Sequence, residues 1–401
     1  MGLSSALVKS NTLNDNPYVI QISKLNNYMN NPIRVLHVLH SMNRGGAENA
    51  LMNYYRHIDR TIVQFDFLLT DNDKCQFEDE ILALGGRVFR VPPMRMSNPF
   101  PYLKGVSKFL SSHPEYRIVH SHTSSKSVFP LWLAKKNGVP VRISHSHSSM
   151  AEGGIMGRIR IALKPFLWLV ATDWLTCGLQ AGEYLYGRKA MQARKAKIFR
   201  NVIECDKYRL NLEMRTKIRK DLNINDDCMV IGHTARFSEV KNHKFDVQIL
   251  REIEALYPNC KLLEVGLGVK EGLSDYARDE GVYEDIIFTG VVKNVWDYEQ
   301  AMDAFILPSF NEGLPLSIIE AQVSGLPCFT TEGTVSKECS VTDLVTYTRL
   351  EEGAKVWAEK IYASRKIERR DRYDEIVAAG YDAETSAREL QDFYLSKYNG
   401  M

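Results

Sequence analysis

The chain lacks an apolar run long enough to cross a membrane. Its longest uninterrupted apolar segment, residues 166–171, is far shorter than the roughly 20 residues that a transmembrane helix needs. It also lacks any CxxC pair and any His-Cys cluster at metal-binding spacing, so its seven cysteines are predicted to be reduced, mostly buried thiols of a cytosolic protein. A formal net charge of only +2 gives no global reason to expect nucleic acid as a partner.

The remaining composition is that of a soluble globular protein. Hydrophobic residues make up 44% and charged residues 25% of the chain, both ordinary fractions for this class. The length of 401 residues exceeds one ordinary core and fits two domains of similar size. Residues 1–28 are polar and Asn-rich, without the cationic and apolar regions of a signal peptide. We therefore expect residues 1–30 to be a disordered extension, with Met29 as an alternative start.

Short apolar runs alternate with longer segments of helical period, which predicts parallel α/β units. A basic segment without a strand signal, 187–200, separates two sets of runs and places the domain boundary near 190–200. We predict one Rossmann-like domain over 31–195, another over 196–382, and a last helix at about 383–398 that packs back on the first. Ligands of such sheets bind at the carboxyl ends of the strands. The predicted strands are 33–39, 65–70, 88–91, 118–122, 141–145, 174–177, 229–233, 262–266, 286–290, 304–308, 328–331 and 345–347.

The most informative segment is 309–327, SFNEGLPLSIIEAQVSGLP. A strand leads into a polar loop with Glu312; a helix then begins near Pro315, carries Glu320 in its second turn and stops at Gly325. The free N–H groups and the dipole of a helix N-terminus favour an anion. Two carboxylates beside an anion site suit the neighbouring hydroxyls of a ribose or hexose attached to a phosphate. The segment therefore predicts a nucleotide-sugar site.

Two other strand-to-helix loops carry groups suited to phosphate. Gly45 and Gly46 follow the first strand and would let backbone amides approach an anion closely, although an ordinary tight turn would look the same. Arg236 and Lys241 follow the first strand of the second half and could together hold a diphosphate. A solvated pair of charges is the alternative for these two cations.

Histidines stand two apart at the ends of two neighbouring strands. They are His120 with His122 and His145 with His147, and the members of each pair share one face of their strand. No carboxylate or cysteine accompanies them at metal-site spacing. We favour a neutral imidazole that hydrogen-bonds a sugar hydroxyl, while core or capping roles stay open for two of the four.

Two further patterns are interpreted as turns. Asp71-Asn72-Asp73 matches a manganese-binding DxD motif but follows a strand, where a polar turn is the favoured interpretation. Gly266, Gly268 and Gly272 resemble a dinucleotide fingerprint, but the third glycine comes one position late, which favours a strand-to-helix turn at the same cleft.

A basic, amphipathic segment stands in the first half. Arg158, Arg160 and Lys164 flank an apolar stripe, and such a pattern suits either an anionic membrane surface or a plain core-facing helix. The apolar residues of this segment are Ile159, Leu163, Phe166, Trp168 and Val170.

Five motifs in this order resemble those of retaining glycosyltransferase family 4. They are Gly45-Gly46, Val119-His120-Ser121-His122, Arg236 with Lys241, Phe288-Thr289-Gly290-Val291, and Glu312 to Glu320. The opening, from Val35-Leu36-His37 to Gly45-Gly46-Ala47-Glu48, looks most like bacterial exopolysaccharide-type members. The resemblance covers about residues 31–395 and implies a GT-B fold, in which two Rossmann-like domains face each other across a deep cleft, with the acceptor on the first domain and the donor on the second.

The resemblance also implies roles for single residues. Glu320 would hold the donor ribose, Glu312 the transferred sugar, Arg236 and Lys241 the departing diphosphate, and Gly46 would offer it a backbone amide. His122, with His120 as second choice, would lie near the reacting sugar. The catalytic set is then His122, Glu312, Arg236 and Lys241. The donor-binding set is Gly45, Gly46, Arg236, Lys241, Val291, Glu312, Gly313, Leu314, Leu316 and Glu320.

The chain departs from the family at two places. It has Asn201-Val202-Ile203-Glu204 where the family often has Asn-Gly-Ile-Asp, which weakens any role for this loop. It has Cys177-Gly178 where the family often has a serine.

We expect a cytoplasmic, metal-independent, retaining enzyme without a cofactor, which could associate peripherally with the inner face of the plasma membrane. It would move a hexose or N-acetylhexosamine from a nucleotide-diphosphate sugar, UDP-linked by preference, to a lipid-linked or oligosaccharide acceptor in exopolysaccharide or capsule synthesis. The alternatives are a nicotinamide-dependent Rossmann oxidoreductase, which the late third glycine disfavours, and a nucleotide-sugar-binding homologue without turnover.

Overall fold

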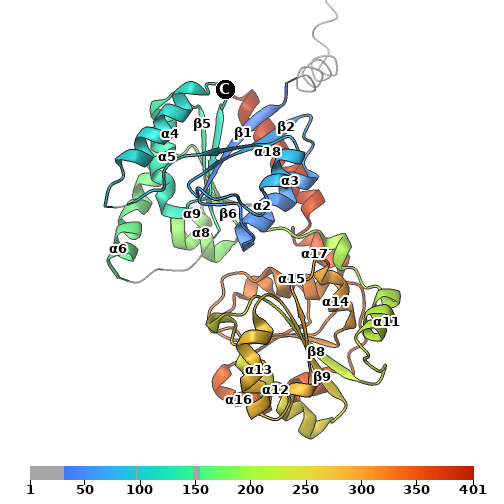
Figure 1. Ribbon diagram of the computed structural model, residues 1–401. Coiled ribbons are helices and arrows are strands. Elements are labelled where there is room, and N and C mark those ends of the chain that lie inside the picture. Colours follow the sequence, from blue (N-terminus) through green and yellow to red (C-terminus); the bar gives the residue numbers. More distant parts are fainter. Residues whose placement is uncertain (1–30, 96, 148–153) are drawn as a thin grey trace, which may run out of the picture.

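A computed structural model describes residues 31–95, 97–147 and 154–401 as two domains, each built on a parallel β-sheet with helices on both faces (Figure 1). The predicted extension, residues 1–30, lies outside the described residues.

The first sheet has seven strands in the order β3-β2-β1-β4-β5-β6-β7, and all of its pairs are parallel. Nearly every residue of the central strands is buried, because helices cover both faces of a parallel sheet. Its strands are β1 (Ile33–Leu39), β2 (Val63–Leu69), β3 (Arg87–Arg90), β4 (Ile118–Ser121), β5 (Val141–Ser146), β6 (Asp173–Thr176) and β7 (Lys197–Ile198).

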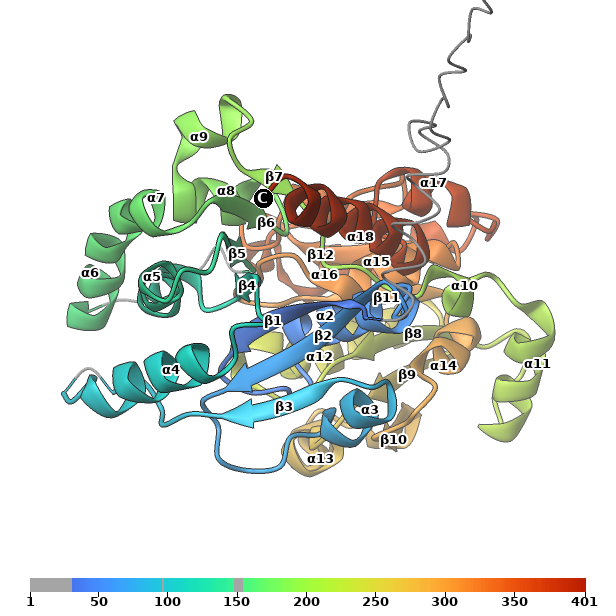
Figure 2. The same ribbon diagram turned by 90° about the horizontal axis from the view of Figure 1, so that it is seen from above.

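Alternation along β1 fixes the two layers of helices around this sheet. Val35 and Leu39 point into a cluster with α2, α3 and α18, whereas Leu36 and Val38 point into a second cluster with α4, α5 and α7; Figure 2 shows both layers from above. The helices of this domain are α2 (Gly46–His57), α3 (Glu78–Ala83), α4 (Phe100–Ser112), α5 (Val128–Lys136), α6 (Gly154–Leu163), α7 (Leu167–Val170), α8 (Leu179–Tyr186), α9 (Arg188–Gln192) and α18 (Ala383–Asn399).

The second sheet has six parallel strands in the order β10-β9-β8-β11-β12-β13. Separate apolar clusters cover its two faces, and Trp357 is fully buried in one of them. Its strands are β8 (Met229–Thr234), β9 (Cys260–Val265), β10 (Ile286–Gly290), β11 (Ala304–Leu307), β12 (Cys328–Thr331) and β13 (Val345–Thr348). Its helices are α10 (Cys205–Tyr208), α11 (Leu212–Asp221), α12 (His243–Leu256), α13 (Val269–Asp279), α14 (Val295–Ala301), α15 (Leu316–Val323), α16 (Gly353–Ser364) and α17 (Tyr373–Ala378).

Each of the twelve predicted strands is present, with ends that differ by at most two residues. The segment 187–200, predicted to hold no strand, contains one: Lys197 and Ile198 form β7, which pairs with β6. The first sheet therefore extends past the predicted boundary at 195/196. Two residues are too few for a periodic pattern, and only the neighbouring strand reveals them.

The chain passes between the domains twice. It leaves the first domain after β7, and Ile203 forms a bridge with Asp382, where the chain returns as α18. Helix α18 packs on α2 of the first domain. The outgoing segment is held to the same helix, because Asn53 Nδ2 donates to Val202 O (2.8 Å) and Tyr54 Oη donates to Arg200 O (2.8 Å).

Candidate active site

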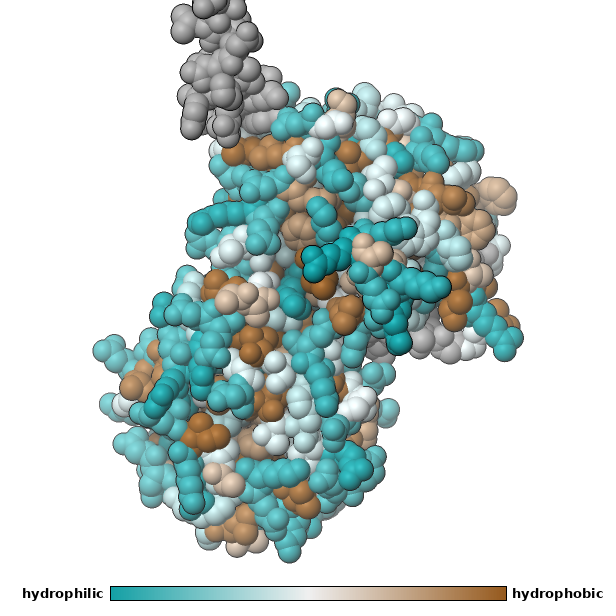
Figure 3. Space-filling model, turned by 180° about the vertical axis from the view of Figure 1, so that it is seen from behind, coloured by the Kyte–Doolittle hydropathy of each residue, from teal (hydrophilic) through white to brown (hydrophobic). Residues whose placement is uncertain are grey.

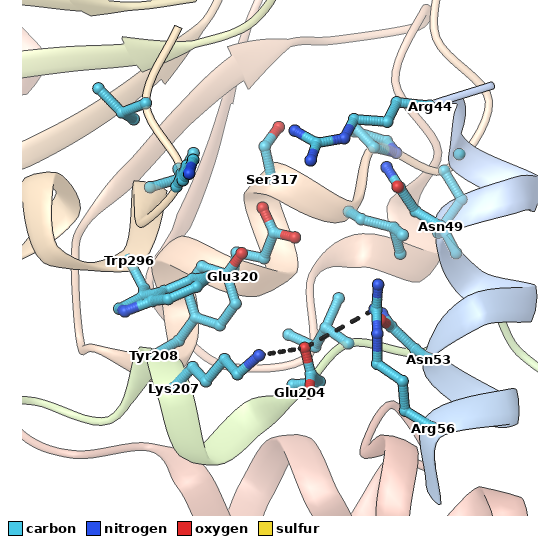
Figure 4. Close-up of a pocket in the computed structure, with 18 of the residues that line it drawn as sticks. Arg44, Asn49, Asn53, Arg56, Glu204, Lys207, Tyr208, Trp296, Ser317 and Glu320 are labelled. Carbon is cyan, nitrogen blue, oxygen red and sulfur yellow. Dashed lines mark hydrogen bonds and ion pairs between the residues drawn. The ribbon is translucent and has the colours of Figure 1, made fainter. Parts of the chain in front are cut away.

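A cavity of about 610 Å³ lies between the two domains and draws its walls from both. From the first domain come the loop after β1 and one face of α2; from the second come the loops after β8, β10 and β11 and the start of α15. Figure 4 shows the labelled side chains of α2 and α15 facing each other across it. Its charged side chains are Arg44, Arg56, Glu204, Lys207, Lys241, Lys293, Glu312 and Glu320.

Lys241 and Glu312 form a direct ion pair in this cavity. Lys241 ends the 3-10 turn η4 (Glu239–Lys241), and its Nζ lies 2.6 Å from Glu312 Oε1. The hydroxyl of Ser309 donates to the same oxygen at 3.0 Å. The carboxylate is thereby held in place at the mouth of the β11 loop, and the cation beside it faces the same space.

Glu320 projects into the cavity from the second turn of α15. Burial raises the pKa of this carboxyl to about 7, and a hydrogen bond with the Tyr208 hydroxyl opposes the shift. Burial also raises the pKa of the neighbouring carboxyl of Glu299, and the nearby Glu320 adds to it. With a pKa of about 7, Glu320 is poised between its two forms at neutral pH.

Helix α15 opens toward the cavity as the sequence predicts. Pro315 is its N-cap in an extended conformation, and Pro315, Leu316 and Ser317 line the cavity, so the free amides of the first turn face it. Proline thus precedes the first helical residue. The helix ends before Gly325, which has a φ of +72° and where a Cβ would lie 2.0 Å from Arg370 O.

Six of the ten predicted donor-binding residues line the cavity: Gly46, Lys241, Glu312, Leu314, Leu316 and Glu320. The lining does not include Gly45, Arg236, Val291 or Gly313. The side chains of Arg236 and Val291 are exposed. Gly313 faces α8 in a narrow crevice. Gly45 is the N-cap residue of α2, and a Cβ there would lie 2.4 Å from Glu48 Oε2, the end of a flexible side chain.

Sequence reasoning missed the side chains that α2 and the linker contribute. Arg44, Asn49, Asn53 and Arg56 reach the cavity from the start and one face of α2 (Figure 4). Their spacing is helical, but it equally fits a solvated face, so the sequence held no specific signal.

The loop 201–204, for which the sequence pattern predicted only a weak role, lines the cavity with Ile203 and Glu204. Glu204 accepts from Lys207 Nζ at 2.5 Å and lies 3.9 Å from Arg56 Nη1 of the first domain. Lys207 in turn lies over the ring of Trp296 at 4.9 Å. The departure from the family pattern therefore does not remove the loop from the site, because its glutamate links both walls of the cavity.

A hydrogen-bonded chain of histidines lies in the first domain. It runs from Asn201 Oδ1 to His147 Nδ1 (2.8 Å), from His147 Nε2 to His122 Nδ1 (2.8 Å), and from His122 Nε2 to His37 Nδ1 (2.9 Å). Burial lowers the pKa of His37 to about 3 and that of His147 to about 4, and it lowers the pKa of His122 well below its ordinary value. All three rings are therefore neutral at pH 7.

The direction of this chain follows from Asn201. A carboxamide oxygen only accepts, so His147 donates through Nδ1, and His122 and His37 donate through Nδ1 in turn. Both nitrogens of His122 are then engaged inside the protein. The expected hydrogen bond from His122 to the sugar stays a prediction, and it would require one of these bonds to exchange. The His122 ring lines a second cavity of about 370 Å³. His120 is likewise engaged, with Tyr394 Oη at 2.7 Å and with His145 Nδ1 at 3.2 Å.

Ring nitrogens of His37, His120 and His122, and those of His122, His145 and His147, lie within 4.8 Å of one another, as metal ligands can. In this structure nitrogens of these rings hydrogen-bond to each other. A second buried group with ligand atoms this close is formed by His233, His243, Asp246 and Glu264, and its two rings stack at 4.4 Å and 22°.

This second group lies beneath the loop that carries Arg236. His233 Nδ1 lies 2.7 Å from Asp246 Oδ2, and His243 Nδ1 lies 3.1 Å from Glu264 Oε2. Burial and the neighbouring Glu264 raise the pKa of Asp246 well above its ordinary value. His243 Nε2 donates to Arg236 O at 3.3 Å, so the network holds the backbone of the predicted diphosphate loop.

The two patterns interpreted as turns are turns. Asp71 to Asp73 follow β2 as a polar turn in which Asp73 N donates to Asp71 Oδ1 at 3.3 Å. Gly266 and Gly268 connect β9 to α13, and a Cβ on Gly266 would lie 1.7 Å from Ala235 O.

The chain is similar to known proteins of one class, both in sequence and in fold. Residues 45–182 match the family "Glycosyl transferase 4-like domain" and residues 214–363 match "Glycosyl transferases group 1". The solved structure of Anabaena HepE in complex with UDP and glucose superposes with a TM-score of 0.70 at 17% identity, over 91% of this chain and 100% of that one. WaaG, a glycosyltransferase involved in lipopolysaccharide biosynthesis, superposes with a TM-score of 0.64 at 14% identity, over 90% and 99%. The fold is GT-B, and the protein is a glycosyltransferase.

Sequence relatives define the family more narrowly. EpsF of Bacillus subtilis (strain 168) is 35% identical over 90% of this chain and 96% of its own length. The capsular polysaccharide biosynthesis glycosyltransferase CapH of Staphylococcus aureus is 24% identical over 91% of this chain and 99% of its own. The chain belongs to this family of bacterial exopolysaccharide and capsule glycosyltransferases. Membership of this family speaks against the alternative of a nicotinamide-dependent oxidoreductase.

Proposed function

We propose that the protein transfers a hexose or N-acetylhexosamine from a UDP-linked sugar to a lipid-linked saccharide, with retention and without a metal ion. In that reaction the bond between the anomeric carbon and the diphosphate oxygen breaks. The acceptor oxygen bonds to the same face of that carbon and loses its proton. The protein must therefore bind two ligands side by side and neutralise a departing diphosphate.

The interdomain cavity is the observation that carries this proposal. Five cationic and three acidic side chains line it, an excess that suits a diphosphate. Lys241 and the first amides of α15 would receive the diphosphate, Glu320 would accept from the ribose hydroxyls, and Glu312 from the transferred sugar. Arg236, Gly45, Val291 and Gly313 would join the donor site through a shift of their loops on binding. HepE and a relative named as a UDP-galactose-dependent transferase support UDP as the donor nucleotide.

A screen of uridine, guanosine and adenosine diphosphate sugars tests the proposal. We expect transfer from a UDP-sugar, unchanged turnover in EDTA, and loss of transfer in Glu320→Ala with an unaltered circular dichroism spectrum. Failure of every donor with every lipid-linked acceptor would instead favour a nucleotide-sugar-binding homologue without turnover.

The second cavity is our candidate for the acceptor. Gly46 lines the donor cavity, while Ala47 and Glu48 line this one, so consecutive residues of α2 separate two adjacent spaces. Lys126 and Arg160 also line it and would face an acceptor phosphate. Burial raises the pKa of Glu48, which suits a carboxyl that meets hydroxyls away from bulk water.

Glu48→Gln tests this assignment. We expect a higher acceptor KM and an unchanged UDP dissociation constant. The reverse pattern would place the acceptor elsewhere.

We further propose that the first domain contacts an anionic membrane surface through α5 to α7. An apolar groove of about 750 Å³ on this side contains Trp132, Phe166 and Leu169, with Lys135 and Lys136 at its edge. In the described part of the chain neither lysine forms an ion pair: Lys135 donates to Leu169 O, and Lys136 lies over the Trp132 ring. Figure 3 shows apolar and hydrophilic side chains interspersed on the edge of the upper domain that carries these helices.

The basic stripe predicted from sequence contributes less to this surface than expected. Lys164 Nζ turns inward to Tyr184 O (2.5 Å), Arg160 lines the second cavity, and Arg158 is exposed. Among the residues that the structure describes, no helix has the length and apolar character of a membrane span.

Phe166→Glu and Leu169→Glu test the membrane contact. They are expected to reduce co-sedimentation with phosphatidylglycerol vesicles. Leu256→Glu, at an exposed apolar site of the other domain, is the matched control. Equal binding of all three variants would refute this surface.

A further inference from the structure

Helix α8 begins without a capping side chain of its own. Its N-cap is Gly178, which follows Cys177 and offers no hydrogen bond to the first turn. Free N–H groups at a helix start are normally satisfied by a serine, threonine, aspartate or asparagine at this position. The family resemblance likewise leads one to expect a serine here. The chain therefore lacks a local cap where one is expected.

The cap is supplied by the other domain. Glu338 stands in the 3-10 turn η6 (Lys337–Cys339) after β12. Its Oε2 accepts from Leu179 N at 2.8 Å, and its Oε1 accepts from Gln180 N at 3.1 Å. Arg200 Nη1, in the segment between the domains, lies 3.8 Å from Oε2. One carboxylate thus binds two amides, favoured also by the dipole of α8.

Glycine at position 178 makes room for this carboxylate. A Cβ on Gly178 would lie 2.9 Å from Glu338 Oε2 and 3.3 Å from Oε1. The backbone is extended at this residue, with φ −172°, so any residue could adopt the conformation. A side chain at position 178 would therefore displace the carboxylate of Glu338, so a glycine instead of a serine here fits a cap that comes from the other domain.

Glu338 is itself fixed to the donor side of the site. Its carbonyl accepts from Tyr381 Oη at 3.0 Å, and its amide donates to Ser336 Oγ at 3.2 Å. Ser336 N donates in turn to Gly313 O at 3.3 Å, beside Glu312. A displacement of Glu338 would therefore move the loop that carries Glu312, because these hydrogen bonds connect the two.

We propose that Glu338 is a positioning residue that caps α8 across the domain interface and thereby holds the two halves of the active site together. Its effect on turnover rests on the proposed function. Its effect on the arrangement of the domains does not, because that arrangement can be measured without any substrate.

Distance measurements between the domains test the proposal directly. Lys108→Cys on α4 and Lys366→Cys after α16 provide exposed labelling sites in the two domains, and the seven native cysteines are buried. Double electron–electron resonance on the labelled, ligand-free protein then reports the distribution of interdomain distances. Glu338→Ala is expected to lower the ratio of molecules with the domain arrangement described above to molecules with longer interdomain distances roughly tenfold or more, the factor expected when charge-assisted hydrogen bonds are lost.

A second substitution separates positioning from simple capping. Glu338→Ala combined with Gly178→Ser gives α8 a local cap in the space that the carboxylate leaves. We expect the double variant to regain the melting temperature lost by Glu338→Ala, while its distances stay widened and its kcat stays low. Gly178→Ser alone should displace the carboxylate and widen the distances as well.

Three outcomes would overturn the proposal. They are an unchanged distance distribution in Glu338→Ala, a wild-type distribution in the double variant, and full turnover with widened distances. Should Glu338→Ala fail to fold, Glu338→Gln serves in its place, because its carboxamide keeps one acceptor and should give an intermediate widening. If no donor supports turnover, the proposed function fails while the distance distributions still decide the role of Glu338.

Discussion

Glu320 should make binding of the donor nucleotide depend on pH around neutrality. Burial raises the pKa of its carboxyl to about 7 in the free protein, and ribose hydroxyls donate hydrogen bonds to the ionised form. Binding therefore favours the carboxylate and lowers its pKa. Below pH 7 the protein must first release a proton, so affinity falls as pH falls and reaches a plateau above pH 8.

The size of the effect follows from the fraction ionised. With a pKa near 7, roughly a tenth of the carboxyl is ionised at pH 6 and roughly nine tenths at pH 8, so affinity for UDP should differ about tenfold. Glu320→Gln removes the charge and should weaken UDP binding by roughly 10- to 100-fold at pH 8. The same variant should lose most of the pH dependence.

A substitution of Tyr208 should shift the pKa of Glu320 in a direction that the structure predicts. Its hydroxyl hydrogen-bonds Glu320 and lowers the pKa of the carboxyl. Tyr208→Phe removes this bond, so the midpoint of the pH dependence should move above 7. A shift downward would contradict the assignment of the donor of that bond.

Isothermal titration calorimetry with UDP between pH 5.5 and 8.5 measures these quantities. Titrations in buffers of different ionisation enthalpy also count the protons released, which should approach one per UDP at pH 6. The reasoning is refuted if wild-type affinity is flat over this range, or if Glu320→Gln keeps the wild-type profile.

Three further predictions concern the diphosphate site, the fold and the histidine chain. Lys241→Met should lower kcat roughly 100- to 1,000-fold, as expected for loss of a cation that faces developing charge, while Lys241→Arg should retain more activity; equal kcat values would argue against the role. Gly325→Ala should destabilise the protein by about 2 kcal/mol or more in urea unfolding, because its Cβ would meet Arg370 O, whereas Gly333→Ala, at φ +86° with nothing within 4 Å, should cost less. Nitrogen-15 NMR of histidine-labelled protein should find His37, His122 and His147 as neutral Nδ1–H tautomers at pH 7, and an Nε2–H tautomer at His122 would reverse the direction of the chain.

The apolar periodicity of the sequence, together with proline and glycine at the ends of helices, was enough to predict the alternating α/β elements. Each strand of four or more residues has its own apolar run, and the strand–loop–helix of 309–327 carries its own signals in Pro315 and Gly325. These features depend on neighbours a few residues away. The two-residue strand β7 depends instead on β6 and was missed.

Some site residues could likewise be predicted from sequence, whereas the positions of others depend on tertiary packing. Lys241, Glu312 and Glu320 follow strands whose carboxyl ends must meet the cleft, so topology alone brings them near the ligand. The exposed position of Arg236, the orientation of its loop above His243, and the engagement of both nitrogens of His122 depend on packing that spacing does not encode. A face of α2 such as Asn49 and Asn53 is indistinguishable in sequence from a solvated one.

The sequence by itself determined the fold, the order of the two domains and the strand-to-helix loops that carry Gly46, Lys241 and Glu312, because each rests on local patterns. Only the tertiary structure decided which charges meet across the cavity. Glu204 with Arg56, and Glu338 with the start of α8, join residues about 150 positions apart. The missing serine before α8 is visible in the sequence, but the carboxylate that replaces it becomes visible only when the two domains are placed together.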